Sequence, residues 1–259
     1  MNLLHAIILG IVEGVTEFLP ISSTGHLILT SNLLRIPTTE FLKSFEIAIQ
    51  LGAILAVVAL YWKDLFVRWE VMKRIAVAFV PTAIVGLLLY PVIKSVLLGN
   101  VRVVIWSLLL GGIVLVVFER WYRKYPPPEH TLAEDVGTIT YSQALFIGAC
   151  QSVAVIPGVS RAAATIVGGL FLGLKRRTIV EFSFLLAVPT MLAATVLDFS
   201  KSASSFASAD FSILGVGFVA SFVVALFVVK WLLTYVQSHT FTAFGWYRIV
   251  AAALFLLFV

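Results

Sequence analysis

The sequence predicts an all-α polytopic membrane protein in which two inverted-topology repeats form a single membrane domain over residues 1–259. Of the 259 residues, 61% are hydrophobic and 12% are charged, against about 45–50% and about 25% in soluble domains. The apolar residues form long runs rather than the alternating pattern of a membrane β-barrel. The single cysteine, Cys150, excludes a disulfide scaffold.

Six runs are apolar enough for membrane-spanning helices, which need about 20 mostly apolar residues. They cover residues 45–62, 75–96, 103–118, 182–199, 211–233 and 244–259. Two further stretches, 3–34 and 141–174, are too long for one helix and carry proline and polar residues at their middles. Irregular backbone at membrane depth is tolerated only where protein or a wet cavity surrounds it. We therefore expect two re-entrant hairpins, with ordinary spans as the alternative.

The two broken stretches also resemble each other, since residues 6–10 match residues 144–148. This similarity divides the chain into repeats of about 1–125 and 141–259, each with one hairpin and three spans. An odd number of crossings inverts the second repeat relative to the first, as in many transporter folds.

The basic residues set the orientation through the positive-inside rule. One side of this layout receives ten of the 18 basic residues: Lys63, Arg68, Lys73, Arg74, Arg120, Arg123, Lys124, Lys175, Arg176 and Arg177. The other side receives Arg35, Lys43, Lys94, Arg102 and Lys201. We expect the ten to be cytoplasmic. Both termini and the first hairpin then open to the outside, the second hairpin opens to the inside, and the hairpin tips meet near the midplane.

The first hairpin carries a polar cluster. Glu13 and Glu17 are four residues apart and share a helix face, and two carboxylates in apolar surroundings are neutralised by protonation or by a cation. Ser23 and His26 are three residues apart at the start of the next half-helix. A hydroxyl, a base and carboxylates are the parts of an activated nucleophile. Mg²⁺ or Ca²⁺ shared by the two glutamates and a phosphate is the candidate cofactor.

The second hairpin carries Ser160 and Arg161 directly after a Pro-Gly turn. A helix start attracts anions through its free N–H groups, and arginine adds a bidentate fork suited to phosphate. The first hairpin offers a similar helix start at Ser22, Thr24 and Gly25. We expect the two anion-attracting ends to face each other. The alternative is that Arg161 only pairs with one of the two glutamates and stabilises the bundle.

Another basic residue, Arg248, lies inside the last predicted span. A buried guanidinium needs compensation for its charge. We expect Glu119 or Glu181 to pair with it, in a structural role.

At these clusters the sequence resembles the undecaprenyl-diphosphate phosphatase family, the membrane phosphatases linked to bacitracin resistance. Residues 13–26, Glu-Gly-Val-Thr-Glu-Phe-Leu-Pro-Ile-Ser-Ser-Thr-Gly-His, look like the family's first signature without a gap, and Pro-Gly-Val-Ser-Arg at 157–161 looks like the core of its second. Residues 45–52, 79–83 and 247–249 also look like family segments, so the similarity runs nearly end to end.

The resemblance implies removal of the terminal phosphate from undecaprenyl diphosphate, which yields the monophosphate carrier used in cell-wall synthesis. It implies catalytic roles for Glu13, Glu17, Ser23, His26 and Arg161. It implies substrate binding by Ser22, Thr24, Gly25, Ser160 and Arg161. The family's fold is an interdigitated inverted repeat in the bacterial plasma membrane, with the chemistry on the outer face. The expected partners are a polyprenyl diphosphate lipid and membrane lipids, with a homodimer as a candidate assembly and no nucleic acid.

One feature departs from the family pattern. The family usually continues Ser-Arg with Ser-Gly, whereas this sequence has Ala162 and Ala163. A hydroxyl donor and a flexible glycine are therefore missing from the second motif.

The residues leave two mechanisms open. Ser23 attacks the phosphorus with His26 as general base, or His26 is the nucleophile and Ser23 positions the phosphate. Glu13 and Glu17 orient His26, hold a cation, or do both. The competing class is a secondary transporter or a lipid-phosphate flippase of the same architecture, because broken helices and membrane carboxylates also fit transport.

Overall fold

The computed structural model describes residues 1–92, 97, 100–127, 135–202 and 210–258. Six long helices carry the predicted spans: α3 (Glu40–Leu60), α5 (Trp69–Leu88), α7 (Val101–Lys124), α10 (Arg176–Ser202), α11 (Asp210–Tyr235) and α12 (Thr242–Phe258). Among the described residues, five helices are long and apolar enough to cross a membrane, and α12 is apolar but shorter, at 17 residues. The predicted class, an all-helical protein with several membrane-spanning helices, is confirmed.

Several helices extend beyond the apolar runs that predict them. Helix α5 begins at Trp69 rather than at residue 75, because Glu70 pairs with Lys73 at 3.0 Å and with Arg74 at 2.8 Å across the first turn. Such pairs one turn apart stabilise a helix outside the apolar region. Two short helices flank α5, namely α4 (Trp62–Phe66) and α6 (Tyr90–Val92).

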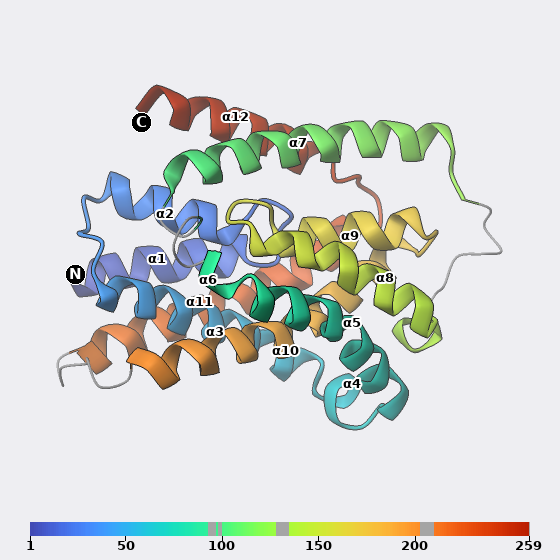
Figure 1. Ribbon diagram of the computed structural model, residues 1–259, viewed down its shortest axis with the longest axis horizontal. Helices are drawn as coiled ribbons and strands as arrows, with labels where there is room; N and C mark the ends of the chain where they lie inside the picture. The colour runs from blue at the N-terminus through green and yellow to red at the C-terminus, as the bar shows by residue number, and fades with distance from the viewer. Residues whose placement is uncertain (93–96, 98–99, 128–134, 203–209, 259) are drawn as a thin grey trace.

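Both broken stretches fold as a half-helix, a loop and a second half-helix, as predicted. The first hairpin consists of α1 (Leu3–Thr16) and α2 (Ser23–Leu33), and the second of α8 (Tyr141–Ser152) and α9 (Arg161–Phe171). The first helices of the two hairpins, α1 and α8, begin 138 residues apart in the chain, and so do the second helices, α2 and α9. Figure 1 shows the hairpins entering from opposite ends of the long axis, with their loops near its middle. Both chain termini lie at the end from which α1 enters.

Each hairpin packs against a helix from the other half of the chain. Helix α1 lies on α11, and α8 lies on α5, while α3 contacts both α10 and α11. These contacts are close because small residues face the neighbouring backbone. A Cβ atom at Gly10 would lie 2.5 Å from the carbonyl oxygen of Gly217, and one at Gly148 would lie 1.9 Å from that of Ala78.

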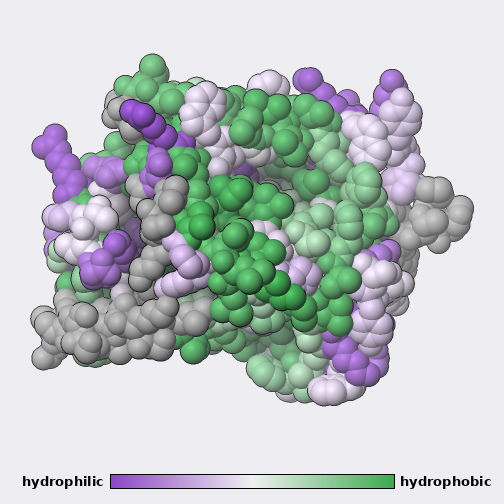
Figure 2. Space-filling view, in the orientation of Figure 1, coloured by the Kyte–Doolittle hydropathy of each residue, from purple (hydrophilic) through white to green (hydrophobic). Residues whose placement is uncertain are grey.

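The surface has an apolar middle and polar ends on the face shown in Figure 2. At the end opposite the termini, Arg68 donates to Asp64 at 2.8 Å and also to Asp135. The bond from Arg68 holds the pKa of Asp135 below its usual range. Lys94 and the side chain of Lys201, predicted for the other end, lie outside the described residues.

Replacing Gly148 by alanine is expected to destabilise the protein, since the new methyl group would overlap the backbone of α5. Overpacking of this kind costs about 1–3 kcal/mol, so the melting temperature in detergent should fall. The matched control is Gly86→Ala on α5, where an added Cβ meets nothing within 4 Å. An unchanged melting temperature for Gly148→Ala would contradict the contact between α5 and α8.

Candidate active site

The two hairpin loops share an unusual backbone conformation. Ser22, directly before α2, has φ 73°, and Ser160, directly before α9, has φ 74°. Among the described non-glycine residues, only these two and Arg35 have positive φ. Positive φ is uncommon for residues with a side chain, and it persists where the surroundings hold the backbone in place, often at functional sites. The two loops are therefore built alike and are fixed by their neighbours.

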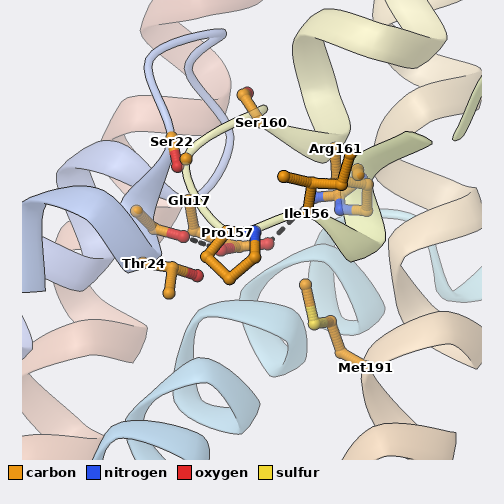
Figure 3. A pocket seen from close by; sticks show the side chains of 11 residues that line it. Glu17, Ser22, Thr24, Ile156, Pro157, Ser160, Arg161 and Met191 are labelled. Atoms are coloured by element: carbon orange, nitrogen blue, oxygen red, sulfur yellow. Dashed lines mark hydrogen bonds and ion pairs between the residues drawn. The ribbon is translucent and has the colours of Figure 1, made fainter. Parts of the chain in front are cut away.

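Glu17 connects the two loops. It follows α1 with helical φ and ψ of −62° and −42°, which keeps it on the helix face of Glu13. The Ser23 hydroxyl donates to Glu17 Oε2 at 2.5 Å, and Arg161 Nη2 donates to Glu17 Oε1 at 3.0 Å. The side chains of Glu17 and Arg161 are 2% and 7% exposed. One carboxylate thus joins the serine of its own hairpin to the arginine of the other (Figure 3).

A cavity of about 70 Å³ lies between the loops. Its polar lining consists of Glu17, Ser22, Ser23, Thr24, Ser160 and Arg161, and its apolar lining of Ala154, Ile156, Pro157, Gly158 and Met191. Figure 3 shows that both loops contribute to this wall, while Met191 reaches it from α10. The structure therefore gathers six of the residues that the sequence predicts for the site around one space.

Arg161 combines an ion pair with a free donor. Its Nη1 donates to the carbonyl oxygen of Ser183 at 2.7 Å, and its Nη2 binds Glu17. The expected ion pair with a glutamate therefore forms, and the buried Nε of the same guanidinium has no hydrogen-bond partner among the described residues.

Three predicted site residues, Glu13, Gly25 and His26, do not line the cavity. Glu13 is fully buried, and neither of its carboxylate oxygens has a partner among the described residues. Gly25 faces α7, where a Cβ would lie 3.2 Å from a methyl group of Val104. The glycine therefore serves the packing of α2 on α7.

His26 has partners that differ from the predicted ones. Its Nδ1 lies 2.7 Å from the carbonyl oxygen of Ser22, and its Nε2 lies 2.8 Å from the Tyr247 hydroxyl. A carbonyl oxygen can only accept, so Nδ1 carries the proton and Nε2 accepts from Tyr247. The two rings also stack at 5.5 Å. Because both ring nitrogens are engaged, Ser23 bonds to Glu17 rather than to His26, and neither glutamate orients the imidazole.

Tyr247 is a site residue whose role the sequence does not reveal. It lies 221 positions from His26, and no local spacing connects residues on α2 and α12.

The predicted ion pair of Arg248 with Glu119 or Glu181 is wrong. Glu119 binds Arg176, and Glu181 binds Arg177. Arg248 instead donates to main-chain carbonyl oxygens of Pro20, Ser107, Leu108, Gly158 and Val159. Carbonyl oxygens can satisfy a guanidinium as fully as a carboxylate does, because each carries two acceptor lone pairs.

Ala162 and Ala163 lie beside the cavity rather than in its wall. The N–H of Ala163 donates to Ser160 Oγ at 3.2 Å and so caps α9. The departure from the family pattern therefore leaves the polar lining of the cavity intact.

The oxygen donors for a divalent cation are limited. Among the described residues, no three His, Cys, Asp or Glu side chains gather in a metal-binding arrangement. Both oxygens of Glu17 are engaged by Ser23 and Arg161, which leaves the carboxylate of Glu13 as the free protein donor. A hard cation such as Mg²⁺ takes only one or two carboxylates when substrate phosphates complete its shell. Glu13 does not line the cavity, so this donor set is compatible with a cation only if a phosphate ligand supplies most of the shell.

Fold and site together define a polytopic helical membrane protein with a hydroxyl–carboxylate–guanidinium centre between two broken helices. The chain belongs to the family described as bacitracin resistance protein BacA, whose family model matches residues 6–254. It is 52% identical to the undecaprenyl-diphosphatase of Aquifex aeolicus, over 98% of this chain and 97% of that protein. It is 52% identical to that of a Sulfurihydrogenibium species, over 99% of both chains. It is 48% identical to the undecaprenyl-diphosphatase of Thermus thermophilus, over 98% of this chain and 96% of that protein.

Arg161→Met is expected to destabilise the protein by about 3–5 kcal/mol, because the buried carboxylate of Glu17 loses its cationic partner. Chemical denaturation in detergent measures this change. The matched control is Arg177→Met, which removes an exposed pair with Glu181 of a type worth about 0–1 kcal/mol. Equal losses for the two variants would contradict a buried pair between Glu17 and Arg161.

Proposed function

We propose that the protein is an integral membrane phosphatase that hydrolyses undecaprenyl diphosphate to undecaprenyl phosphate and inorganic phosphate, which recycles the lipid carrier for cell-wall synthesis. One observation carries the proposal: the Ser23 hydroxyl donates to the Glu17 carboxylate beside Arg161, at the cavity between the loops. Relatives about half identical over their full length bear the name undecaprenyl-diphosphatase. That name disfavours the transporter and flippase alternative.

The diphosphate head binds between the two loops, and the polyprenyl tail extends along the apolar surface of the helices. Arg161, which lines the cavity, brings its positive charge to the phosphates, together with the helix starts at Ser23 and Arg161. Positioning and neutralisation of charge supply most of the catalysis of phosphoryl transfer. Ser22, Thr24 and Ser160 add hydroxyl groups at the cavity wall.

In the first step, Ser23 Oγ attacks the terminal phosphorus while Glu17 accepts the hydroxyl proton. The bond from this phosphorus to the bridging oxygen breaks, and undecaprenyl phosphate leaves with the bridging oxygen and its electron pair. The products on the protein are a phosphoserine at Ser23 and a protonated Glu17. The 2.5 Å hydrogen bond lies along the path of this proton, which is the arrangement of a nucleophile beside its base.

In the second step, water attacks the phosphorus of the phosphoserine. The bond from phosphorus to Ser23 Oγ breaks, and Glu17 returns its proton to that oxygen. The water oxygen and both of its hydrogens leave as part of the inorganic phosphate. The site then has its original protonation.

His26 acts as a positioning residue in this mechanism. Its ring connects the backbone of Ser22 to Tyr247, directly beside Ser23. The alternative, in which His26 is the nucleophile, requires Nε2 to release Tyr247 before it can attack. The existing contact between Ser23 and Glu17 therefore favours serine.

The fold is proposed to contain two inverted repeats. If the two halves are related by symmetry, α1 corresponds to α8 and α11 corresponds to α5. The contact of α1 with α11 is then equivalent to the contact of α8 with α5. The identical spacing of the helix starts and the opposite entry of the hairpins support the same relation.

The end opposite the termini is proposed to be cytoplasmic, because it carries most of the basic residues. The termini then lie outside, and the chemistry is proposed to lie on the outer face, as the family resemblance implies. The homodimer stays a prediction, which the mass of the protein in detergent tests.

A divalent cation is proposed to bind between Glu13 and the diphosphate oxygens. When bound, Mg²⁺ or Ca²⁺ would neutralise phosphate charge. The protein contributes the carboxylate of Glu13, which the structure leaves without a hydrogen-bond partner among the described residues.

Ser23→Ala should lower phosphate release from a polyprenyl diphosphate by roughly 10⁴-fold, as expected for loss of a nucleophile. Release is measured on the purified protein in detergent, with Ser238→Ala, at an exposed turn, as control. Acid quenching during turnover should trap phosphate on Ser23. Phosphate trapped on His26 would overturn the serine mechanism, and labelled lipid crossing vesicles without phosphate release would overturn the enzyme.

Removal of divalent cations with a chelator should abolish activity, and added Mg²⁺ or Ca²⁺ should restore it. The Glu13→Gln variant should need a higher cation concentration for half-maximal activity, since it loses a negative oxygen ligand. Activity that is indifferent to chelators would remove the cation from the proposal.

A further inference from the structure

Arg248 is 0% exposed and forms no ion pair among the described residues. Its five N–H groups instead make five hydrogen bonds to carbonyl oxygens. Nη1 donates to Pro20 at 3.2 Å and Val159 at 3.0 Å, Nη2 donates to Ser107 and Gly158 at 3.0 Å, and Nε donates to Leu108 at 3.3 Å. Every donor of the guanidinium is therefore used on main-chain atoms.

Three of these five carbonyls come from the two hairpin loops. Pro20 precedes Ser22 by two residues, and Val159 directly precedes Ser160. The two serines are the non-glycine residues with positive φ in the described lining of the cavity. Such a backbone is maintained only where its surroundings over-determine it. One guanidinium thus holds both of the unusual loop segments at once.

Helix α7 is shaped to receive this guanidinium. Two of the acceptors, Ser107 and Leu108, lie on α7, and the glycine that follows one turn later leaves the necessary space. A Cβ at Gly111 would lie 2.0 Å from Arg248 Nη2. Gly158 is close to the same helix, because a Cβ there would lie 2.7 Å from the carbonyl oxygen of Val104. The loops, α7 and α12 therefore meet at one point through Arg248.

We propose that Arg248 is a positioning residue for the hydrolysis, which fixes the separation of the two loops at which Glu17 bonds to both Ser23 and Arg161. This inference rests on the proposed function. Arg248 does not line the cavity, so it acts through the loops and not on the substrate. Lysine cannot replace it, because a single ammonium with three donors lacks the planar fork that reaches carbonyls on three segments.

The test compares Arg248→Lys and Arg248→Met with wild type, as purified full-length protein in detergent below the melting temperature of each variant. We expect kcat to fall about 100-fold, the loss that a displacement of about 1 Å produces in a positioned site, while KM is unchanged. The matched control is Arg176→Met, which breaks the partly buried pair with Glu119 near the start of α12. It should lower the melting temperature and keep kcat.

Wild-type kcat for folded Arg248→Lys would overturn the proposal. An equal loss of kcat in Arg176→Met would also overturn it, because the effect would then follow stability alone. Gly111→Ala provides a second variant, in which Arg248 is present but displaced. It should lower kcat as well, whereas Gly86→Ala should not.

A readout without substrate separates this inference from the proposed function. Amide hydrogen exchange in peptides covering residues 17–24 and 154–162 should be faster in Arg248→Lys than in wild type or Arg176→Met. Unchanged exchange in these peptides would overturn the positioning role. If wild type releases no phosphate from any polyprenyl diphosphate, the proposed function fails, and the exchange result still decides whether Arg248 holds the loops.

Discussion

The structure depends on the meeting of Glu17 and Arg161. These residues lie 144 positions apart, one in each hairpin, and a buried charge of either sign is costly without its partner. The pair therefore requires that both hairpins end at the same depth and face each other. It also fixes the position of Ser23, because the same carboxylate accepts the serine hydroxyl. One carboxylate therefore stabilises the buried pair and binds the proposed nucleophile.

The broken helices create a second requirement. A loop at membrane depth exposes N–H and carbonyl groups that lipid cannot satisfy. Two side chains satisfy some of these groups. His26 on α2 donates to the carbonyl oxygen of Ser22, and Arg248 on α12 donates to three loop carbonyl oxygens. The loops can therefore be irregular, and can present a polar cavity, without leaving these backbone groups unpaired.

The site is not fully compensated, and this incompleteness is consistent with its function. Among the described residues, the buried Glu13 carboxylate and the Nε of Arg161 have no hydrogen-bond partner. Natural folds tend to break local rules where they bind or react. A carboxylate ready for a cation and a guanidinium donor ready for a phosphate oxygen are complementary to a diphosphate head.

The membrane class, the breaks in both hairpins and most of the polar residues at the cavity can be predicted from the amino-acid sequence, because hydrophobicity, proline and helical spacing act between near neighbours in the chain. The partners of these residues follow from packing between distant segments and could not be predicted. Helical spacing suggested that Ser23 pairs with His26, yet Ser23 binds Glu17 across the loop. Arg248 was expected to need an acid, yet it binds carbonyls from three distant segments. Such contacts depend on which loops the packing of α7 and α12 brings together. No local sequence pattern encodes how close two distant segments lie in the fold.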